Sequence, residues 1–252
     1  MIYPNFPFDF LIDIALMFGA FIYVGITIVI PMFLKKKEIL SKFQARKTVH
    51  LFAGLAVLVT PFFTWPIYSI IIAGTLTFLT LKSSKKSRVK QLRELYESIG
   101  EEEEEKVGFL QGPFHYCLSI TSLIAFFVFF VPHKLYFPIA GILLMIISDT
   151  LASLVGKNYG KLSLKLPWTG PRTVEGSTTF FISAFLLCLF SFWFFGFNDV
   201  HSQVTLTMQE VILFSLLTSG IATGIELISP STWDDLTVPI ASTFLIFILT
   251  LF

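Results

Sequence analysis

An acidic residue interrupts one of the apolar segments of this chain. Asp149 lies in the run Ile146–Gly156, whose other residues are uncharged, and a carboxylate at membrane depth is costly and usually functional. On a helix, Asp149 and Ser153 share a face with Ala152 and Gly156, so the acid lies on a seam of small residues. Such a seam lets a ligand come close, although it could instead serve helix packing.

A basic loop that contains glycines follows this segment. It carries Gly156, Lys157, Gly160 and Lys161, and glycines beside cations allow backbone N–H groups and side chains to surround phosphate oxygens. Membrane proteins also keep basic loops for topology alone, which is the plainer interpretation of any single lysine here.

The next apolar segment opens with a cation, an acid and several hydroxyls. Arg172, Thr173, Glu175, Gly176 and Ser177 would form a helix N-terminus suited to anions and to oxygens that bridge a metal. Together with the acid at position 149 and the basic loop, this pattern has the parts needed to bind a metal-bound polyphosphate.

Further acids follow near the end of the chain. Glu226 shares a helix face with Ser219 and Ala222, and Asp234 and Asp235 come shortly after it. Asp149, Glu175 and Glu226 are expected at the same depth and on the same side, and acids that converge in a low dielectric repel one another strongly. We therefore expect a divalent metal or the basic loops to neutralise them.

A second group of candidate residues lies near the start of the chain. On a helix, Lys47, His50 and Gly54 share a face, with Arg46 beside them. These cations could contact phosphate or could simply anchor a helix at the membrane surface.

The composition defines the medium in which these residues act. The chain has 252 residues, of which 54% are hydrophobic, 14% are charged and 30 are Phe, and its mean hydropathy is +0.78. This describes an integral membrane protein. Cys117 and Cys188 both lie in apolar runs and predict packing rather than a disulfide or metal framework.

Apolar segments set the expected architecture. We predict an all-α, polytopic membrane bundle of about eight transmembrane helices, or seven if the second and third segments form one re-entrant hairpin. The segments are 10–34, 48–63, 65–81, 114–131, 135–156, 174–196, 205–228 and 236–252.

The distribution of Lys and Arg predicts the topology. All but one of the 18 cations lie in the loops 35–47, 82–106 and 157–172, which share one side if the segments alternate. The positive-inside rule assigns that side to the cytoplasm and both termini to the outside.

The most polar stretch, 82–110, predicts an amphipathic helix on the cytoplasmic surface. Val89, Leu92, Tyr96 and Ile99 recur at helical spacing, whereas the acidic run Glu101–Glu105 is typical of a solvated, poorly ordered segment. No internal repeat is visible, so residues 1–252 are expected to form a single membrane-embedded catalytic domain.

Three stretches together resemble one family. They are Asp149-x-x-Ala-Ser-x-x-Gly-Lys-x-x-Gly-Lys with Arg172-Thr-x-Glu-Gly-Ser, Arg46-Lys-x-x-His with Gly54, and Glu226-x-x-Ser with Asp234-Asp-Leu-Thr-Val-Pro. This pattern resembles the CTP-dependent polyprenol kinases, which include dolichol, phytol, farnesol and yeast-type diacylglycerol kinases, within the phosphatidate cytidylyltransferase superfamily. The family usually has Lys at the position of Arg172 and often Asn at that of Asp235.

The resemblance implies a Mg²⁺-dependent transfer of the γ-phosphate of CTP to a membrane lipid alcohol at the cytoplasmic face. Asp149, Glu175 and Asp234 would hold the metal, and one acid among Asp149, Glu226 and Asp235 would accept the hydroxyl proton. CTP and the bilayer are the other expected partners, and nucleic acid is not. The residues expected to contact the nucleotide or its phosphates are Arg46, Lys47, His50, Ser153, Gly156, Lys157, Gly160, Lys161, Arg172, Thr173, Gly176 and Ser177.

Two other functions stay open at this point. A related enzyme could use the same parts to make a CDP-lipid from phosphatidate, although the longer C-terminal signature of the cytidylyltransferases is missing from the sequence. An ion-coupled transporter also needs intramembrane acids, but here the acids cluster with the basic loops and no inverted repeat is visible. Which lipid alcohol is used and the oligomeric state are not indicated by the sequence.

Overall fold

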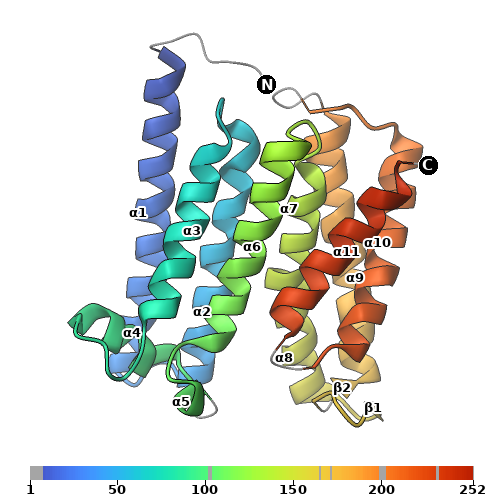
Figure 1. The fold of residues 1–252 in the computed structure, drawn as a ribbon. Coiled ribbons are helices and arrows are strands. Elements are labelled where there is room, and N and C mark those ends of the chain that lie inside the picture. Colours follow the sequence, from blue (N-terminus) through green and yellow to red (C-terminus); the bar gives the residue numbers. More distant parts are fainter. Residues whose placement is uncertain are drawn as a thin grey trace. The chain divides into compact units, whose positions relative to one another are not determined.

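The computed structural model describes residues 8–101, 104–164, 166–170, 172–198, 203–230 and 233–251. It is built almost entirely of helices (Figure 1), which confirms the predicted all-α class. The chain divides into two compact units, Met1–Ser122 and Leu123–Phe252. The prediction of one catalytic domain over 1–252 stays a prediction.

Among the described residues, the first unit contains five α-helices, a 3-10 segment called η1, and the beginning of α6. Its elements are α1 (Phe8–Lys36), α2 (Lys42–Gly54), η1 (Leu55–Phe62), α3 (Ile67–Lys82), α4 (Lys90–Ile99), α5 (Glu104–Val107) and the start of α6 (Gln111–Phe130).

Side-chain to backbone hydrogen bonds stabilise two of the connections between helices in this unit. Ser41 and Gln44 form a reciprocal capping box that starts α2 directly after the basic end of α1. At the other end of α1, the buried Asp13 carboxylate accepts the backbone N–H groups of Thr64 and Trp65, both at 2.8 Å. Asp13 thereby provides hydrogen-bond acceptors for two backbone N–H groups of the turn between η1 and α3.

The second unit holds the remaining helices and a short antiparallel hairpin in which Ser163 pairs with Thr173. Two π-helical segments, η2 and η3, interrupt its helices. Its elements after α6 are α7 (Tyr136–Leu143), η2 (Leu144–Ser148), α8 (Asp149–Tyr159), β1 (Ser163–Leu164), β2 (Arg172–Thr173), α9 (Val174–Ser191), η3 (Phe192–Phe197), α10 (Met208–Ile228) and α11 (Asp234–Leu249).

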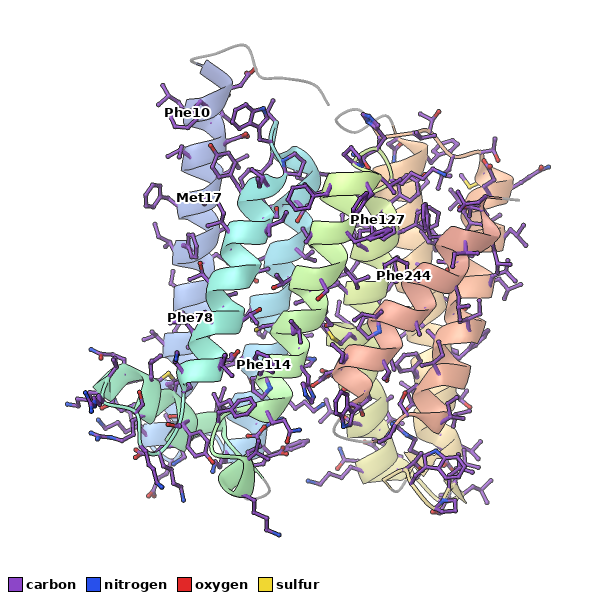
Figure 2. All side chains as sticks on the ribbon, in the orientation of Figure 1. Phe10, Met17, Phe78, Phe114, Phe127 and Phe244 are labelled. Atoms are coloured by element: carbon purple, nitrogen blue, oxygen red, sulfur yellow. The ribbon has the colours of Figure 1, made fainter. Side chains whose placement is uncertain are left out.

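Aromatic side chains form much of the core of the second unit. Phe127 on α6 packs against Phe244 and Phe247 on α11, with ring centroids 6.2 and 5.2 Å apart (Figure 2). Phe137 on α7 contacts Phe192 of η3 at 5.5 Å. Aromatic pairs at these separations add to the stability that area burial gives, and they join the ends of helices far apart in sequence.

The apolar segments predicted from the sequence all fall on helices. Among the residues that the structure describes, five helices are long and apolar enough to cross a membrane: Asp9–Lys36, Gln111–Phe130, Tyr136–Tyr159, Val174–Phe197 and Met208–Ile228. The helices α3 and α11 have 16 residues each, about 24 Å against a hydrocarbon core of about 30 Å. The count of eight spans and the predicted topology therefore stay predictions.

The polar stretch 82–110 does form an amphipathic helix, α4, but its environment differs from the expectation. Leu95, Tyr96 and Ile99 pack into a protein cluster with Ala45 and Leu110, whereas Val89 is exposed. The helix therefore buries its apolar face against neighbouring helices of its own unit.

Candidate active site

A π-helical turn positions Asp149. The continuous helix Tyr136–Tyr159 is widened over Leu144–Ser148, and Asp149 is the first residue after this turn. Such single π turns rotate the residues that follow them and occur often at functional sites. The acid that stood out in the sequence therefore lies at a local irregularity of its helix.

Glycines bring α8 and α9 into close contact. A Cβ on Gly176 would lie 3.0 Å from the Ala152 carbonyl oxygen and 3.4 Å from the Cα of Gly156, and one on Gly160 would lie 2.9 Å from the Cβ of Thr173. These three glycines were predicted to contact phosphate. In this structure each of them is needed for helix packing, and their phosphate contacts stay predictions.

The hairpin between α8 and α9 is anchored at both ends. The Trp168 indole N–H donates to the carbonyl oxygen of Ile228 at the end of α10, at 2.9 Å. The backbone N–H of Leu162 donates to Glu175 Oε2 at 3.4 Å. Glu175, predicted as a metal ligand, therefore directs its carboxylate toward the hairpin, and Figure 1 shows β1 and β2 beside the end of α8.

Arg172 on β2 is the central cation of the site. Its Nη1 forms an ion pair with Glu226 Oε1, and its Nη2 contacts the Ser229 carbonyl oxygen at 3.2 Å and Asp234 Oδ2 at 3.4 Å. The Arg172 side chain is only 13% exposed. Here the guanidinium neutralises acids from α10 and α11, so its predicted contact with phosphate stays a prediction.

Asp149 lies close to Asp235, and its charge also acts on the predicted metal ligand Asp234. One carboxylate oxygen of Asp149 lies within 4.8 Å of one of Asp235. Burial and the neighbouring Asp149 and Asp235 carboxylates raise the pKa of Asp234, whereas Arg172 lowers it. Glu226 and Asp234 share the one guanidinium of Arg172, and buried acids keep their charge only with compensating cations or hydrogen bonds.

Several buried polar atoms of this site lack hydrogen-bond partners among the residues that the structure describes. They are Ser148 Oγ, Arg172 Nε, Ser177 Oγ and Glu226 Oε2. The Ser177 hydroxyl lies close to the Glu226 carboxylate. Most buried polar atoms in proteins are paired, so a group of unpaired ones at one place suits a site that binds a ligand or an ion.

The remaining predicted phosphate contacts in this unit differ in accessibility. Lys157 and Lys161 are exposed, near the end of α8 and in the loop after it, and Lys157 lies about 12 Å along the helix axis from Asp149. Ser153 donates to the carbonyl oxygen of Thr150, and Thr173 Oγ1 accepts the backbone N–H of Gly176 as the N-cap of α9. The two lysines are thus better suited to reach a polyphosphate than Ser153 and Thr173.

Arg46, Lys47 and His50 lie in the first unit, on α2. Arg46 Nη1 is 3.1 Å from Glu104 Oε1, and its Nε is 3.5 Å from Glu101. The predicted solvated character of the acidic run is wrong for Glu104, because this residue is buried by its contacts with Arg46 and the backbone.

The ring of His50 packs on Tyr116 with 4.1 Å between centroids, and Lys47 is half-buried. The structure thus gives Arg46 a structural partner, and the phosphate roles of all three residues stay predictions.

Sequence reasoning missed Ser148 and Glu104. Ser148 directly precedes Asp149, and a hydroxyl next to an intramembrane acid is a signal that could have identified it. Glu104 carried no such signal, because five consecutive acids look alike in the sequence and its partner Arg46 lies 58 residues away.

Similarity over most of the chain agrees with these motifs. The chain is 26% identical to a probable chloroplastic phytol kinase 2 from Glycine max, over 86% of this chain and 68% of the relative. It is 29% identical to a phytol kinase from Synechocystis sp., over 87% of this chain and 85% of the relative.

A probable phytol kinase from Zea mays is 26% identical over 86% of this chain and 70% of the relative. No family model matches the chain, and no solved structure matches it significantly. The resemblance to the phytol and polyprenol kinases is therefore confirmed by relatives that align with most of the sequence.

Proposed function

We propose that this protein is a membrane kinase that transfers the γ-phosphoryl group of CTP to the hydroxyl of an isoprenoid lipid alcohol of the phytol class. The observation that carries the proposal is the acid cluster of unit 2, in which Asp149 and Asp235 lie close together beside Arg172. The names of the relatives support the alcohol, and the family resemblance supports CTP as the donor.

The donor atoms of the cluster suit Mg²⁺. Carboxylate oxygens are hard ligands, and Mg²⁺ typically binds one or two of them together with phosphate oxygens of the substrate. Asp149 and Asp235 would hold the ion, and the unpaired Glu226 Oε2 gives the site further capacity for positive charge. When bound, the ion would neutralise charge on the triphosphate.

Phosphoryl transfer needs little covalent chemistry from the protein. The alcohol oxygen forms a bond to the γ-phosphorus, the bond from that phosphorus to the β–γ bridging oxygen breaks, and CDP leaves. The proton of the alcohol passes to a carboxylate oxygen of Asp149 or Asp235. Glu226 is less suited to this role because Arg172 holds its other oxygen.

Exposed lysines supply the contacts to the triphosphate. Lys157 and Lys161 extend from the end of α8, at a distance from Asp149 that an extended triphosphate can span. Arg172 acts as a positioning residue, since it fixes Glu226 and Asp234 and joins the hairpin to α10 and α11.

The position of the cluster in unit 2 suits a substrate that stays in the membrane. Glu226 and Arg172 lie at or beside the ends of apolar helices, and Asp149 lies ten residues before the end of the helix Tyr136–Tyr159. A lipid hydroxyl below the bilayer surface can therefore reach them while its apolar tail remains in lipid. With the basic loops in the cytoplasm, the nucleotide enters from that side.

The origin of the transferred phosphorus tests this proposal. Purified protein in lipid vesicles is incubated with phytol, farnesol, a dolichol or diacylglycerol, and with CTP labelled at either the α- or the γ-phosphate. We expect label in phosphorylated phytol from γ-labelled CTP, and none when Mg²⁺ is removed with a chelator. Label in the lipid from α-labelled CTP would instead indicate CDP-lipid synthesis, and no transfer to any of the alcohols would contradict a lipid kinase.

A further inference from the structure

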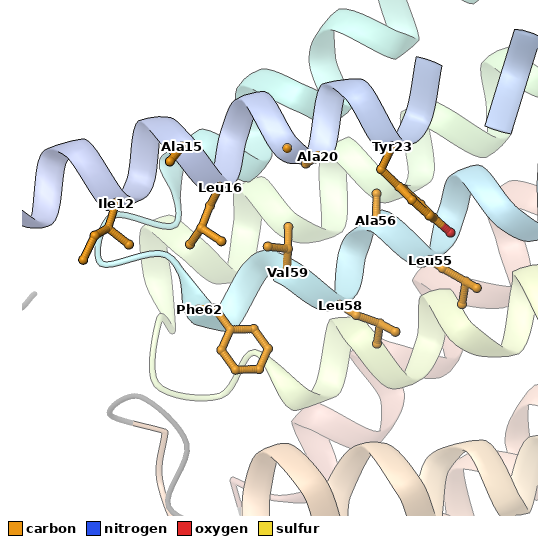
Figure 3. Close-up of a pocket in the computed structure, with 11 residues that line it drawn as sticks. Ile12, Ala15, Leu16, Ala20, Tyr23, Leu55, Ala56, Leu58, Val59 and Phe62 are labelled. Atoms are coloured by element: carbon orange, nitrogen blue, oxygen red, sulfur yellow. The ribbon is translucent and has the colours of Figure 1, made fainter. Parts of the chain in front are cut away.

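A groove opens along α1 in the first unit. It lies between α1 and η1 and has a volume of about 670 Å³ (Figure 3). Ile12, Leu16 and Tyr23 line it from α1, and Ala56 and Val59 line it from η1.

The lining chemistry favours an apolar occupant. Tyr23 carries the one side-chain hydroxyl among the lining residues, and that hydroxyl already donates to the carbonyl oxygen of Phe52 at 2.8 Å. A bound water needs two to four polar partners, so this groove is unsuited to water. Folded proteins are close-packed, and a space of this size favours a hydrocarbon.

The position of the groove indicates where that hydrocarbon comes from. α1 is one of the helices that can cross a membrane, and the lining residues Ile12 and Tyr23 are themselves 43% and 37% exposed. The groove is therefore continuous with the lipid-facing surface of α1. Between Ile12 and Tyr23 it follows about 16 Å of helix, half the hydrocarbon thickness of a bilayer and thus the depth of one leaflet.

We propose that this groove binds one acyl chain of a bilayer phospholipid. Small residues on both walls, Gly19 and Ala56 among them, leave the space that the chain fills. The proposal does not depend on the phosphoryl-transfer activity, because the groove and the acid cluster belong to different units of the chain.

Two glycines of α1 provide a matched test. A Cβ added at Gly19 or at Gly25 meets nothing within 4 Å, so both helix positions accept a larger residue. Only Gly19 is a lining residue of the groove. Gly19→Leu fills the groove, and Gly25→Leu adds the same side chain to the same helix outside it.

The probe is a phosphatidylcholine with a photoreactive diazirine in its acyl chain, incorporated into vesicles that contain the purified protein. After illumination, we expect labelled peptides from both α1 and η1 in the wild type and in Gly25→Leu. In Gly19→Leu this labelling should fall about tenfold, since several methylene groups lose their contacts. Ala56→Leu, which fills the groove from the opposite wall, should have the same effect, and melting temperatures show that all the variants are folded.

Two results would overturn the proposal. Equal labelling of α1 and η1 in all the folded variants would mean that the groove has no bound chain. Displacement of the probe by excess phytol, but not by excess unlabelled phosphatidylcholine, would assign the groove to the alcohol instead.

Discussion

Two largely buried arginines, one in each unit, are surrounded by carboxylates, and they differ in how completely their neighbours are satisfied. Around Arg46, the two oxygens of Glu104 accept backbone N–H groups from Gly112 at 2.8 Å and Glu101 at 2.9 Å, in addition to the guanidinium. A side chain at Gly112 would collide with the guanidinium of Arg46. This cluster is closed by its own backbone.

The buried polar groups around Arg172 are less completely paired. Glu226 and Asp234 share one guanidinium, and both Arg172 Nε and Glu226 Oε2 are buried without a hydrogen-bond partner among the described residues. Satisfied buried networks make a fold rigid, whereas partly satisfied ones are costly unless something else completes them. The comparison therefore distinguishes an arginine whose acidic neighbour is fully hydrogen-bonded from one whose neighbours are not, which residue types alone could not do.

The largest expected effect is a loss of turnover that differs between substitutions at the adjacent acids Asp234 and Asp235. Asp235→Asn should lower turnover by about 1,000-fold, because Asp235 lies close to Asp149 and shares its proposed role. Asp234→Asn should cost only about tenfold, because Asp234 acts through Arg172 and an amide can still accept its hydrogen bond. Transfer of label from γ-labelled CTP to phytol measures both, and equal losses would remove the distinction between the two acids.

Removing the Arg172 guanidinium should strongly destabilise the protein. Arg172→Met leaves Glu226 and Asp234 without their cation and should lower the free energy of unfolding by about 3–5 kcal/mol. Adding Glu226→Gln in the same chain should recover part of this loss, which a double-mutant cycle measures by denaturant titration in micelles. Arg93→Met, at an exposed position on α4, is the matched control, and a comparable loss in it would refute the assignment.

A substitution in the Arg46–Glu104 cluster of unit 1 should lower the stability of the protein without changing its activity. Glu104→Gln removes the charge that faces Arg46 but keeps an acceptor for the backbone, so we expect a loss of about 1–3 kcal/mol. Turnover per folded molecule should stay near the wild-type value. Unfolding and activity are measured on the same preparation, and a loss of activity without a loss of stability would mean that the Arg46 cluster belongs to the catalytic site.

Alanine substitutions at two glycines test the close contact between α8 and α9, and one of them should have the smallest effect of all. Gly176→Ala places a Cβ 3.0 Å from the Ala152 carbonyl oxygen and should cost about 1–3 kcal/mol through overpacking. Gly220→Ala on α10, where a Cβ meets nothing within 4 Å, should be neutral or stabilising by up to about 1 kcal/mol. Thermal unfolding of both variants checks this, and equal shifts would show that the close contact does not matter.

Much of the fold could be predicted from the sequence because its signals are local. The apolar segments coincide with helices, since a length of apolar residues is itself the requirement for a span. Ser41 with Gln44 is a capping box that can be identified from sequence alone. The π-helical turn before Asp149 had no such signal, because it arises from packing between helices.

The sequence predicted several of the residues that belong to the site, but not which of them contact one another. Asp149 and Glu226 were candidates because acids are costly in an apolar chain, and Asp234 and Asp235 because of the family resemblance. The structure pairs Glu226 and Asp234 with Arg172 and places Asp149 near both of these acids. Which acid faces the cation and which faces another acid depends on how α10 and α11 pack. Arg46 illustrates the same point, since its partner Glu104 was one of five acids that the sequence could not tell apart.

The most direct test of the account compares Asp149→Asn with Glu104→Gln in one assay. Both variants remove one buried or site carboxylate charge, and transfer of label from γ-labelled CTP to phytol is measured per folded molecule. The account predicts that Asp149→Asn loses about 1,000-fold in turnover with an unchanged melting temperature, whereas Glu104→Gln keeps its turnover and melts lower. Substantial turnover in a folded Asp149→Asn variant would contradict it.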